Sequence, residues 1–181
     1  DSGHSYPFKI EFSSADKIGK RNPRAKHKIL SQTVTYNFKT GPGKYPESLN
    51  YDVMITLSTI NFPWDVPDPM NPDHYYWEIS FQTMEEWQKM TNRSDSRVLP
   101  TIANIILHFF NRLLPTLEDN DVKTFGFEGI EEVGREKAFT TNSKRTRVYA
   151  LMIARYAKQL GLNIVMSKGS TGENSVLFKV N

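Results

Sequence analysis

The 181-residue sequence predicts an α+β protein in which a mixed, mainly antiparallel sheet carries two long helices. Four segments with alternating apolar and polar residues occupy the first 83 positions, as expected for half-buried strands. Farther along, apolar residues recur twice at helical spacing, and short strand patterns separate and follow these two segments. Strands first, then alternating helices and strands, imply a sheet with helices packed on it in a single domain, 1–181.

Four strands are predicted in the N-terminal half, at 6–12, 29–38, 51–60 and 75–83. The first places Phe8, Ile10 and Phe12 on one face and Lys9 and Glu11 on the other. The other three repeat this alternation and add aromatic and β-branched residues, which favour strands. The turn-rich segment 39–50 joins the second strand to the third.

Two further loops interrupt these strands. The loop at 13–28 is basic and polar, and it contains Gly19 and Pro23. The loop at 61–74 holds four prolines, which exclude a helix and a central strand. Its apolar residues either fold back on the domain or dock a partner, and Trp64 is the predicted interface residue. These apolar residues are Phe62, Trp64, Val66 and Met70.

The first helix is predicted from the apolar stripe at 102–113, with Ser94, Asp95 or Ser96 as its N-cap, Pro100 in its first turn and Pro115 at its end. Its polar side is expected to carry four residues, namely Asn104, His108, Asn111 and Arg112. A strand follows at 122–127. The second helix is predicted to begin at 142 or 143 and to end at Gly161. A hairpin of strands 162–167 and 175–180 closes the fold.

Composition excludes several classes of site. The chain has no cysteine, which excludes a disulfide scaffold, a thiolate metal site and a cysteine nucleophile. Four histidines share no metal-ligand spacing, so no metal site is expected. The short motifs of serine hydrolases, P-loop proteins and metalloproteases do not occur. No run approaches 18 apolar residues and no secretory signal pattern opens the chain, so no membrane contact is expected.

Charge is uneven along the chain. Residues 1–50 carry a net charge of +5, residues 51–136 of −9, and residues 137–181 of +7. Two basic segments around an acidic middle indicate a polyanionic partner, or basic and acidic parts that meet within one chain or between copies. The predicted contacts to a polyanion or partner are Lys17, Lys20, Arg21, Arg24, Lys26, Lys28, Lys144, Arg145 and Arg147. For the basic residues of 17–28, a solvated loop is the alternative. Nucleic-acid binding is a possible function of these residues together with the basic residues of 144–147.

From 29 onward the predicted order of elements resembles the GNAT acetyltransferase fold, in which three antiparallel strands lead into helix, strand, helix and a final strand pair. The segment 142–149 is also similar to the family's Asn-x-x-Ala-x-x-Leu-Tyr helix, with Arg145 and Val148 in place of Ala and Leu. The resemblance implies Tyr149 as general acid and Glu78 as general base of an N-acyltransferase. A core tyrosine and a solvent-facing carboxylate are the alternatives for these two residues.

The coenzyme loop departs from that family. GNAT enzymes bind the acetyl-CoA pyrophosphate with a Gln/Arg-x-x-Gly-x-Gly/Ala loop, whose small residues let backbone N–H groups approach phosphate. The corresponding stretch, 91–97, contains Arg93 and Arg97 but no glycine, and Asp95 would repel phosphate. We therefore expect no cofactor. Acetyl-CoA, with Arg93 and Arg97 as its contacts, belongs to the alternative in which the chain is an active N-acyltransferase.

The stretches 100–114, 123–127 and 144–162 are also similar to small uncharacterised proteins of tailed bacteriophages. This resemblance implies a non-catalytic binding or structural protein, located in the virion or in the infected host cytoplasm. Its partners would be other protein subunits, including copies of itself or virion proteins, and Asp1 would be a processed N-terminus. Nucleic-acid binding is retained as a second alternative to the acyltransferase.

Overall fold

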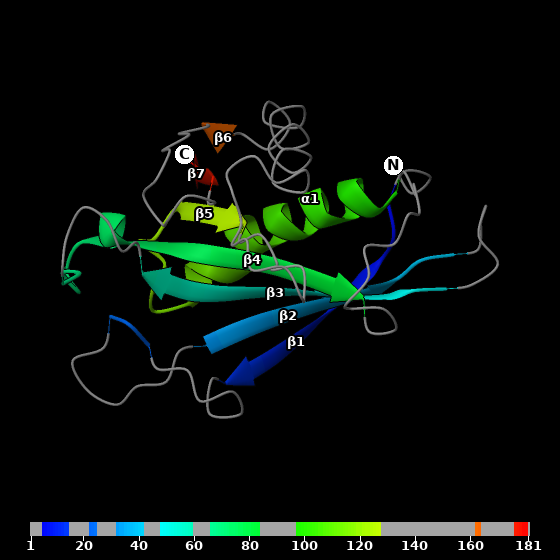
Figure 1. Ribbon diagram of the computed structural model, residues 1–181, viewed down its shortest axis with the longest axis horizontal. Helices are drawn as coiled ribbons and strands as arrows, with labels where there is room; N and C mark the ends of the chain where they lie inside the picture. The colour runs from blue at the N-terminus through cyan, green and yellow to red at the C-terminus, as the bar shows by residue number, and fades with distance from the viewer. Residues whose placement is uncertain are drawn as a thin grey trace, which may run out of the picture.

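The computed structural model describes residues 5–14, 22–24, 32–41, 48–59, 66–83, 97–127, 162–163 and 176–180. These residues form a seven-stranded sheet in the order β1-β2-β3-β4-β5-β7-β6, with a long helical stretch packed on it (Figure 1). The strands are β1 (Phe8–Ser14), β2 (Gln32–Lys39), β3 (Asn50–Thr59), β4 (Tyr75–Thr83), β5 (Thr124–Phe127), β6 (Leu162–Asn163) and β7 (Val176–Val180).

The first four strands form an antiparallel meander, as their alternating patterns predict. In register, Ile10 lies opposite Tyr36, Tyr36 opposite Val53, and Val53 opposite Phe81. The observed β4 has the predicted bounds, while β1 begins two residues later than predicted. The reason is that the Tyr6 N–H donates to Thr101 in the helix, and Pro7 has no N–H to donate. The alternation therefore located all four strands.

The sheet becomes mixed at β4 and β5, which run parallel with Trp77 opposite Phe125. The helical stretch forms the crossover between them, as parallel neighbours require. Strand β7 then pairs antiparallel with β5 and with β6, so the antiparallel pairing predicted for the two C-terminal strands is confirmed, while the turn between them lies outside the described residues. A mixed, mainly antiparallel sheet is thus observed, while the predicted second helix lies outside the described residues.

The helical stretch consists of α1 (Val98–His108), a π-helical turn (Phe109–Leu113) and a 3-10 turn (Leu114–Thr116). The predicted N-cap at Ser94, Asp95 or Ser96 is wrong, because the N-cap is Arg97 and no side chain caps the helix. Pro100 lies in the first turn and has no N–H to satisfy, which reduces the need for a cap.

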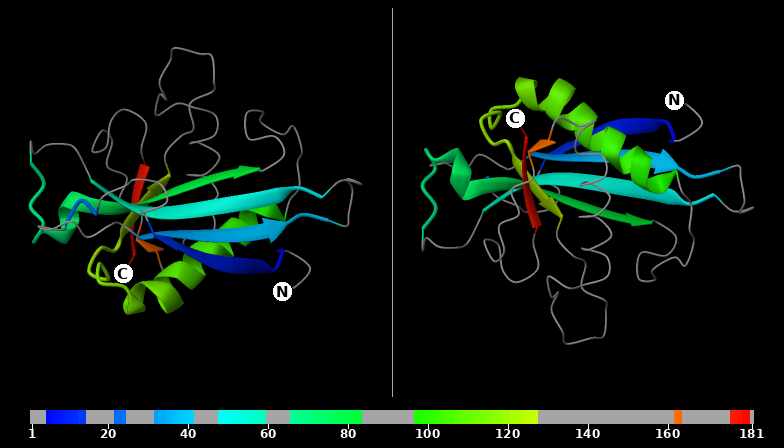
Figure 2. Two further views of the ribbon diagram at one scale, coloured as in Figure 1. Left: turned by 90° about the horizontal axis from the view of Figure 1, so that it is seen from below. Right: turned by 90° about the horizontal axis from the view of Figure 1, so that it is seen from above.

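By length and composition alone, Val98–Thr116 is apolar enough to cross a membrane. Half of its most apolar window is buried inside the protein, and Figure 2 shows α1 lying along one face of the sheet. Its apolar side chains are therefore accounted for by the core.

The core lies between the helical stretch and that face of the sheet. Trp77 meets Phe109 edge-on, with ring centroids 5.1 Å apart, and its Nε1–H donates to the Val122 carbonyl at 3.0 Å. Phe110 contacts Phe125 in the same layer, at 5.3 Å. Burial of these aromatic rings fixes the helix against β4 and β5.

His108 does not lie on the polar side of the helix, where it was predicted. Its Nδ1 lies 3.0 Å from the buried Tyr36 hydroxyl, and its ring meets the edge of Phe8 at 5.6 Å. The reason is that a buried hydroxyl needs a hydrogen-bond partner, and His108 is the helix residue that supplies one. The other three residues predicted for the polar side, Asn104, Asn111 and Arg112, are exposed.

Candidate interaction site

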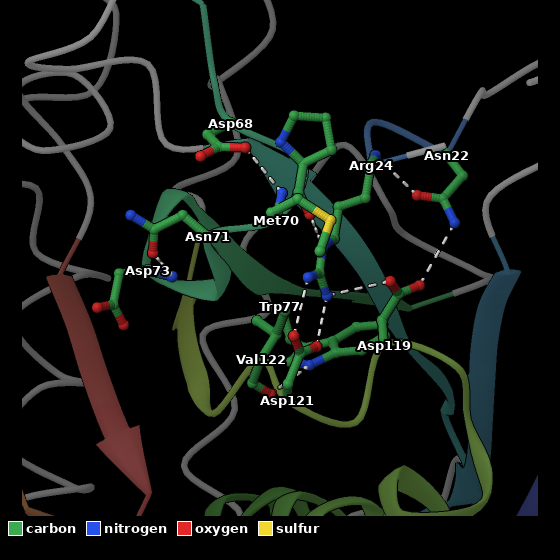
Figure 3. Close-up of polar contacts among 11 residues, drawn as sticks. Asn22, Arg24, Asp68, Met70, Asn71, Asp73, Trp77, Asp119, Asp121 and Val122 are labelled. Atoms are coloured by element: carbon green, nitrogen blue, oxygen red, sulfur yellow. Dashed lines mark hydrogen bonds and ion pairs between the residues drawn. The ribbon is translucent and has the colours of Figure 1, made fainter. Parts of the chain in front are cut away.

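The candidate site lies at the end of the sheet where β4 and β5 begin. Three segments that are distant in sequence meet there, namely 22–24, 66–74 and 117–123 (Figure 3). The second of these is the described part of the predicted Pro-rich loop, and we call it the docking loop. The third is the turn that leads from the helical stretch into β5.

Arg24 connects the three segments. Its Nε–H donates to the Pro69 carbonyl at 3.1 Å, in the docking loop. Its Nη1 group donates to Asp119 at 3.3 Å, and both terminal nitrogens donate to the two carboxylate oxygens of Asp121, Nη2 at 2.8 Å. The guanidinium also lies over the Tyr75 ring, 5.3 Å from its centroid. One largely buried cation therefore holds a loop and a turn to the start of β4.

The pKa values of the two carboxylates are shifted in opposite directions. The hydrogen bonds from Arg24 lower the pKa of Asp121 below its ordinary value of 3.8. Burial raises the pKa of Asp119 above that value, and the attraction of Arg24 offsets this only in part. Asp121 is thus the main counter-ion of Arg24, whereas Asp119 is shared with the Asn22 side-chain amide, which donates to it at 3.3 Å.

Local hydrogen bonds fix the shape of the docking loop. The Asp68 N–H donates to His74 Nδ1 at 2.9 Å, and the Asp68 carboxylate accepts from the Met70 N–H at 2.9 Å. Asn71 caps the 3-10 turn Pro72–His74 by accepting from the Asp73 N–H at 3.0 Å. Such side-chain-to-backbone bonds are the turn chemistry of Asp and Asn, so the loop holds its shape without a sheet partner.

The docking loop presents two large apolar side chains to solvent. Val66 is 81% exposed and Met70 is 77% exposed, although neighbouring Pro69 is held by Arg24. Of the two predicted fates of the apolar residues in this loop, folding back on the domain is therefore wrong for Val66 and Met70. Phe62 and the predicted interface residue Trp64 lie outside the described residues.

The predicted catalytic and coenzyme residues that the structure describes are engaged within the protein. Glu78 lies on the opposite side of β4 from Trp77, half-buried, and its carboxylate accepts from the Ser58 hydroxyl at 2.9 Å. The guanidinium of Arg97 lies 4.4 Å from the centroid of the Tyr6 ring, at the far end of the sheet from Arg24. Neither residue is brought together with the Arg24 cluster.

Most of the other predicted site residues lie outside the described residues. These are Tyr149, Arg93, Lys17, Lys20, Arg21, Lys26, Lys28, Lys144, Arg145 and Arg147. Arg24 is the one member of the predicted polyanion contacts that the structure describes, and its charge is directed at Asp119 and Asp121. While these ion pairs hold, Arg24 offers little to a phosphate.

Sequence reasoning missed Asn22, Asp119 and Asp121 as parts of a site. The charge asymmetry was the available signal, because it indicated that basic and acidic parts meet within one chain or between copies. Arg24 from the basic first segment and the two aspartates from the acidic middle meet in that way within the chain. Lys179 from the basic last segment lies 3.8 Å from Asp73, a second contact of this kind.

Among the described residues, no group of three or more His, Asp or Glu side chains is arranged to hold a metal ion. Comparisons with protein-family models, with curated proteins and with solved structures give no match.

Proposed function

We propose that this protein is a non-catalytic binding protein built on a GNAT-like fold, and that it docks a protein partner through the docking loop. The observation that carries the proposal is the exposure of Val66 and Met70 on a loop whose backbone is fixed by Arg24, His74 and Asn71. A preshaped apolar loop loses little conformational entropy on binding, which is the physical advantage of a rigid docking element.

The sheet supports the GNAT-like part of the proposal. Three antiparallel strands lead into α1, then β5, and the chain closes with the β6–β7 pair, in the order of elements that the resemblance implies. Thr33, Thr56 and Tyr76 are buried although they lie on the side of the sheet opposite α1. Buried residues on both faces of the sheet are what a GNAT-like sheet with helices on either side requires.

The absence of catalysis is proposed on two contacts. Arg97, a candidate for the coenzyme pyrophosphate, lies over the Tyr6 ring, 4.4 Å from its centroid, so its guanidinium takes part in the packing of the protein itself. Glu78, the candidate base, already accepts a hydrogen bond from the Ser58 hydroxyl at 2.9 Å, so its carboxylate is engaged within the sheet. Both groups serve the protein's own packing in this arrangement.

The chemistry around the docking loop indicates the kind of partner. Asp68 and Asp73 are exposed beside Val66 and Met70. A fitting partner surface therefore offers an apolar depression rimmed by lysine or arginine. Under the bacteriophage resemblance, that partner is another virion protein or a protein of the infected cell.

Site-specific photo-crosslinking tests the proposal. The chain has no cysteine, so Val66→Cys and Met70→Cys each provide one unique position for a cysteine-reactive photo-crosslinker. During phage infection or virion assembly, both positions should crosslink to the same protein with apolar and basic residues at its labelled sites. Lys39→Cys, at an exposed position on β2, is the matched control and should not label that protein.

A second arm uses binding strength. Val66→Ser with Met70→Ser should reduce affinity for the crosslinked partner at least tenfold without lowering the midpoint of thermal unfolding, because both side chains are exposed. Equal labelling from Lys39, or unchanged affinity of the double variant, would contradict a docking role. Mass spectrometry of purified virions then distinguishes a structural from an intracellular partner.

An N-acyltransferase is the second candidate, and the parallel strand pair favours it. The carboxyl ends of β4 and β5 lie at one end of the sheet. Tyr6 precedes β1 at this same end and donates its N–H to Thr101 at 2.8 Å, so the first turn of α1 lies there too. Ligands of open sheets often bind at such ends. Acetyl-CoA would then contact Arg93 and Arg97, with Glu78 as base and Tyr149 as acid. Calorimetry with millimolar acetyl-CoA tests this, and the absence of both heat and thermal shift would exclude it.

A further inference from the structure

Strand β1 forms one edge of the sheet, and among the described strands it pairs with β2 alone (Figure 1). An edge strand of seven residues presents alternate backbone N–H and C=O groups outward, where they can pair with another strand. Ile10 shares the face of its buried partner Tyr36, yet it is 38% exposed. The apolar layer is therefore incompletely covered at this edge.

The sequence of this edge is complementary to itself. Lys9 and Glu11 flank Ile10 and are both exposed on the outer face. If two copies of β1 pair antiparallel about an axis through Ile10, each Lys9 lies opposite the partner's Glu11, and Phe8 opposite the partner's Phe12. Axes through Lys9 or Glu11 instead place like charges opposite each other, which is unfavourable. One register is thus selected by charge.

We propose that two copies of this chain associate through β1, antiparallel and centred on Ile10, to form one continuous sheet across the dimer. Directly opposed residues of an antiparallel pair share a face, so this register places the α1 helices of both protomers on the same side. Ile10 and the partner's Ile10 then cover each other beside the Phe8 rings. In the dimer, the outward backbone N–H and C=O groups of each β1 gain hydrogen-bond partners, and the exposed Ile10 side chains are covered.

Charge reversal tests the pairing. Lys9→Glu places carboxylates opposite each other twice in the dimer, and Glu11→Lys does the same with ammonium groups. Each should raise the dimer dissociation constant, measured by analytical ultracentrifugation, about tenfold or more at low salt. The double variant Lys9→Glu, Glu11→Lys restores opposite charges and should restore the wild-type constant. Lys39→Glu, at the exposed end of β2, is the control and should have no such effect.

Cysteine crosslinking tests the register in the cysteine-free chain. Ile10→Cys should form an intermolecular disulfide with itself under mild oxidation, since opposed residues of paired strands come within disulfide range. Lys9→Cys alone should not, whereas a mixture of Lys9→Cys and Glu11→Cys protein should form the mixed disulfide.

A wild-type chain that stays monomeric up to its solubility limit would overturn the proposal. So would a dimer whose dissociation constant is unchanged by both single charge reversals. A disulfide between two copies of the Lys9→Cys variant would overturn it as well. Thermal unfolding of each variant verifies that its fold is retained, which the exposure of Lys9 and Glu11 leads us to expect. The outcome is independent of the docking loop, which lies on a different part of the chain.

Discussion

Arg24 binds Asp121 through both terminal nitrogens of its guanidinium, across 97 positions of sequence. Together with its bonds to Asp119 and Pro69, this pair connects a short N-terminal segment to the turn before β5 and to the docking loop. A bidentate, largely buried arginine contributes more to folding stability than an exposed ion pair does. Without the Arg24 side chain, the carboxylates of Asp119 and Asp121 would lie near each other with no counter-charge.

Arg24→Ala should therefore lower the free energy of unfolding by about 2 kcal/mol, a loss set by the unpaired carboxylates and the unbonded Pro69 carbonyl. Urea unfolding at neutral pH measures this. Lys39→Ala, at an exposed position, is the control and should change stability by less than about 0.5 kcal/mol. A loss of similar size in the control variant, or no loss at Arg24, would show that this cluster does not join the segments.

Acid should separate the roles of the two aspartates. The pKa of Asp121 is lowered in the folded state, so its stabilising effect is present above its unfolded pKa and is lost as the pH falls through the folded pKa. Asp121→Asn should cost about 1 kcal/mol at neutral pH. The difference from the wild type should begin to shrink near pH 4 and should vanish only below the lowered folded pKa of Asp121. Urea midpoints measured across this range provide the test.

Asp119 should show the opposite sign. Its pKa is raised in the folded state, so folding favours the protonated form, and this contribution is lost as the pH rises through the folded pKa. Asp119→Asn should therefore gain stability relative to the wild type as the pH rises above about 4. A parallel pH dependence of the two variants would be inconsistent with these assignments.

Strand periodicity predicted the first four strands of the sheet, because apolar residues at every second position mark the buried face of each strand. Val53 and Ile55 on β3 and Trp77 and Ile79 on β4 are all buried, as the alternation indicated. The predicted N-cap was wrong because Ser94, Asp95 and Ser96 are residue types that favour this position, whereas the observed N-cap Arg97 makes no side-chain capping bond; Pro100 lies in the first turn as predicted. The parallel pairing of β4 with β5 is a tertiary relationship that periodicity does not encode.

The candidate site was harder to predict for a similar reason. A charged residue on a polar loop carries no local sign of its partner, so the sequence does not distinguish Arg24 from the other basic residues of 17–28. Its partner Asp121 is contributed by a turn that follows a helix nearly a hundred residues later. The described part of the Pro-rich loop, 66–74, holds neither a strand nor an α-helix, as its prolines indicate, but the exposure of Val66 and Met70 depends on which residues hold its backbone.

The Tyr36–His108 contact should show an asymmetric response to substitution. Tyr36→Phe removes a hydroxyl and leaves His108 Nδ1, which is half-buried, and the cost should be about 1 kcal/mol. His108→Ala instead leaves the fully buried hydroxyl of Tyr36 unpaired and removes the ring packed on Phe8, so the cost should be about 3 kcal/mol. Chemical denaturation of both variants gives the two values.

The double variant separates these causes. In a Tyr36→Phe background, His108→Ala no longer leaves a hydroxyl unpaired, so it should cost about 1 kcal/mol less than in the wild type. Strict additivity would mean that the 3.0 Å contact contributes nothing beyond packing. Because burial also raises the pKa of Tyr36, its hydroxyl should stay protonated in the folded state well above the ordinary value of 10.0.

The docking loop should lose its fixed shape when the acceptor of the Asp68 N–H is removed. His74→Ala deletes Nδ1, so the amides of Asp68 and Met70 should exchange with deuterium about tenfold faster or more, as expected when a local hydrogen bond is lost. Hydrogen exchange by mass spectrometry measures this, with the β3 amides as the internal reference. Global stability should change little because the loop is exposed.

Exchange that is unchanged at Asp68 would mean that Arg24 and Asn71 alone hold the loop, and His74→Ala should then leave partner affinity intact. Faster exchange should instead lower that affinity, since a mobile loop must be ordered when it binds.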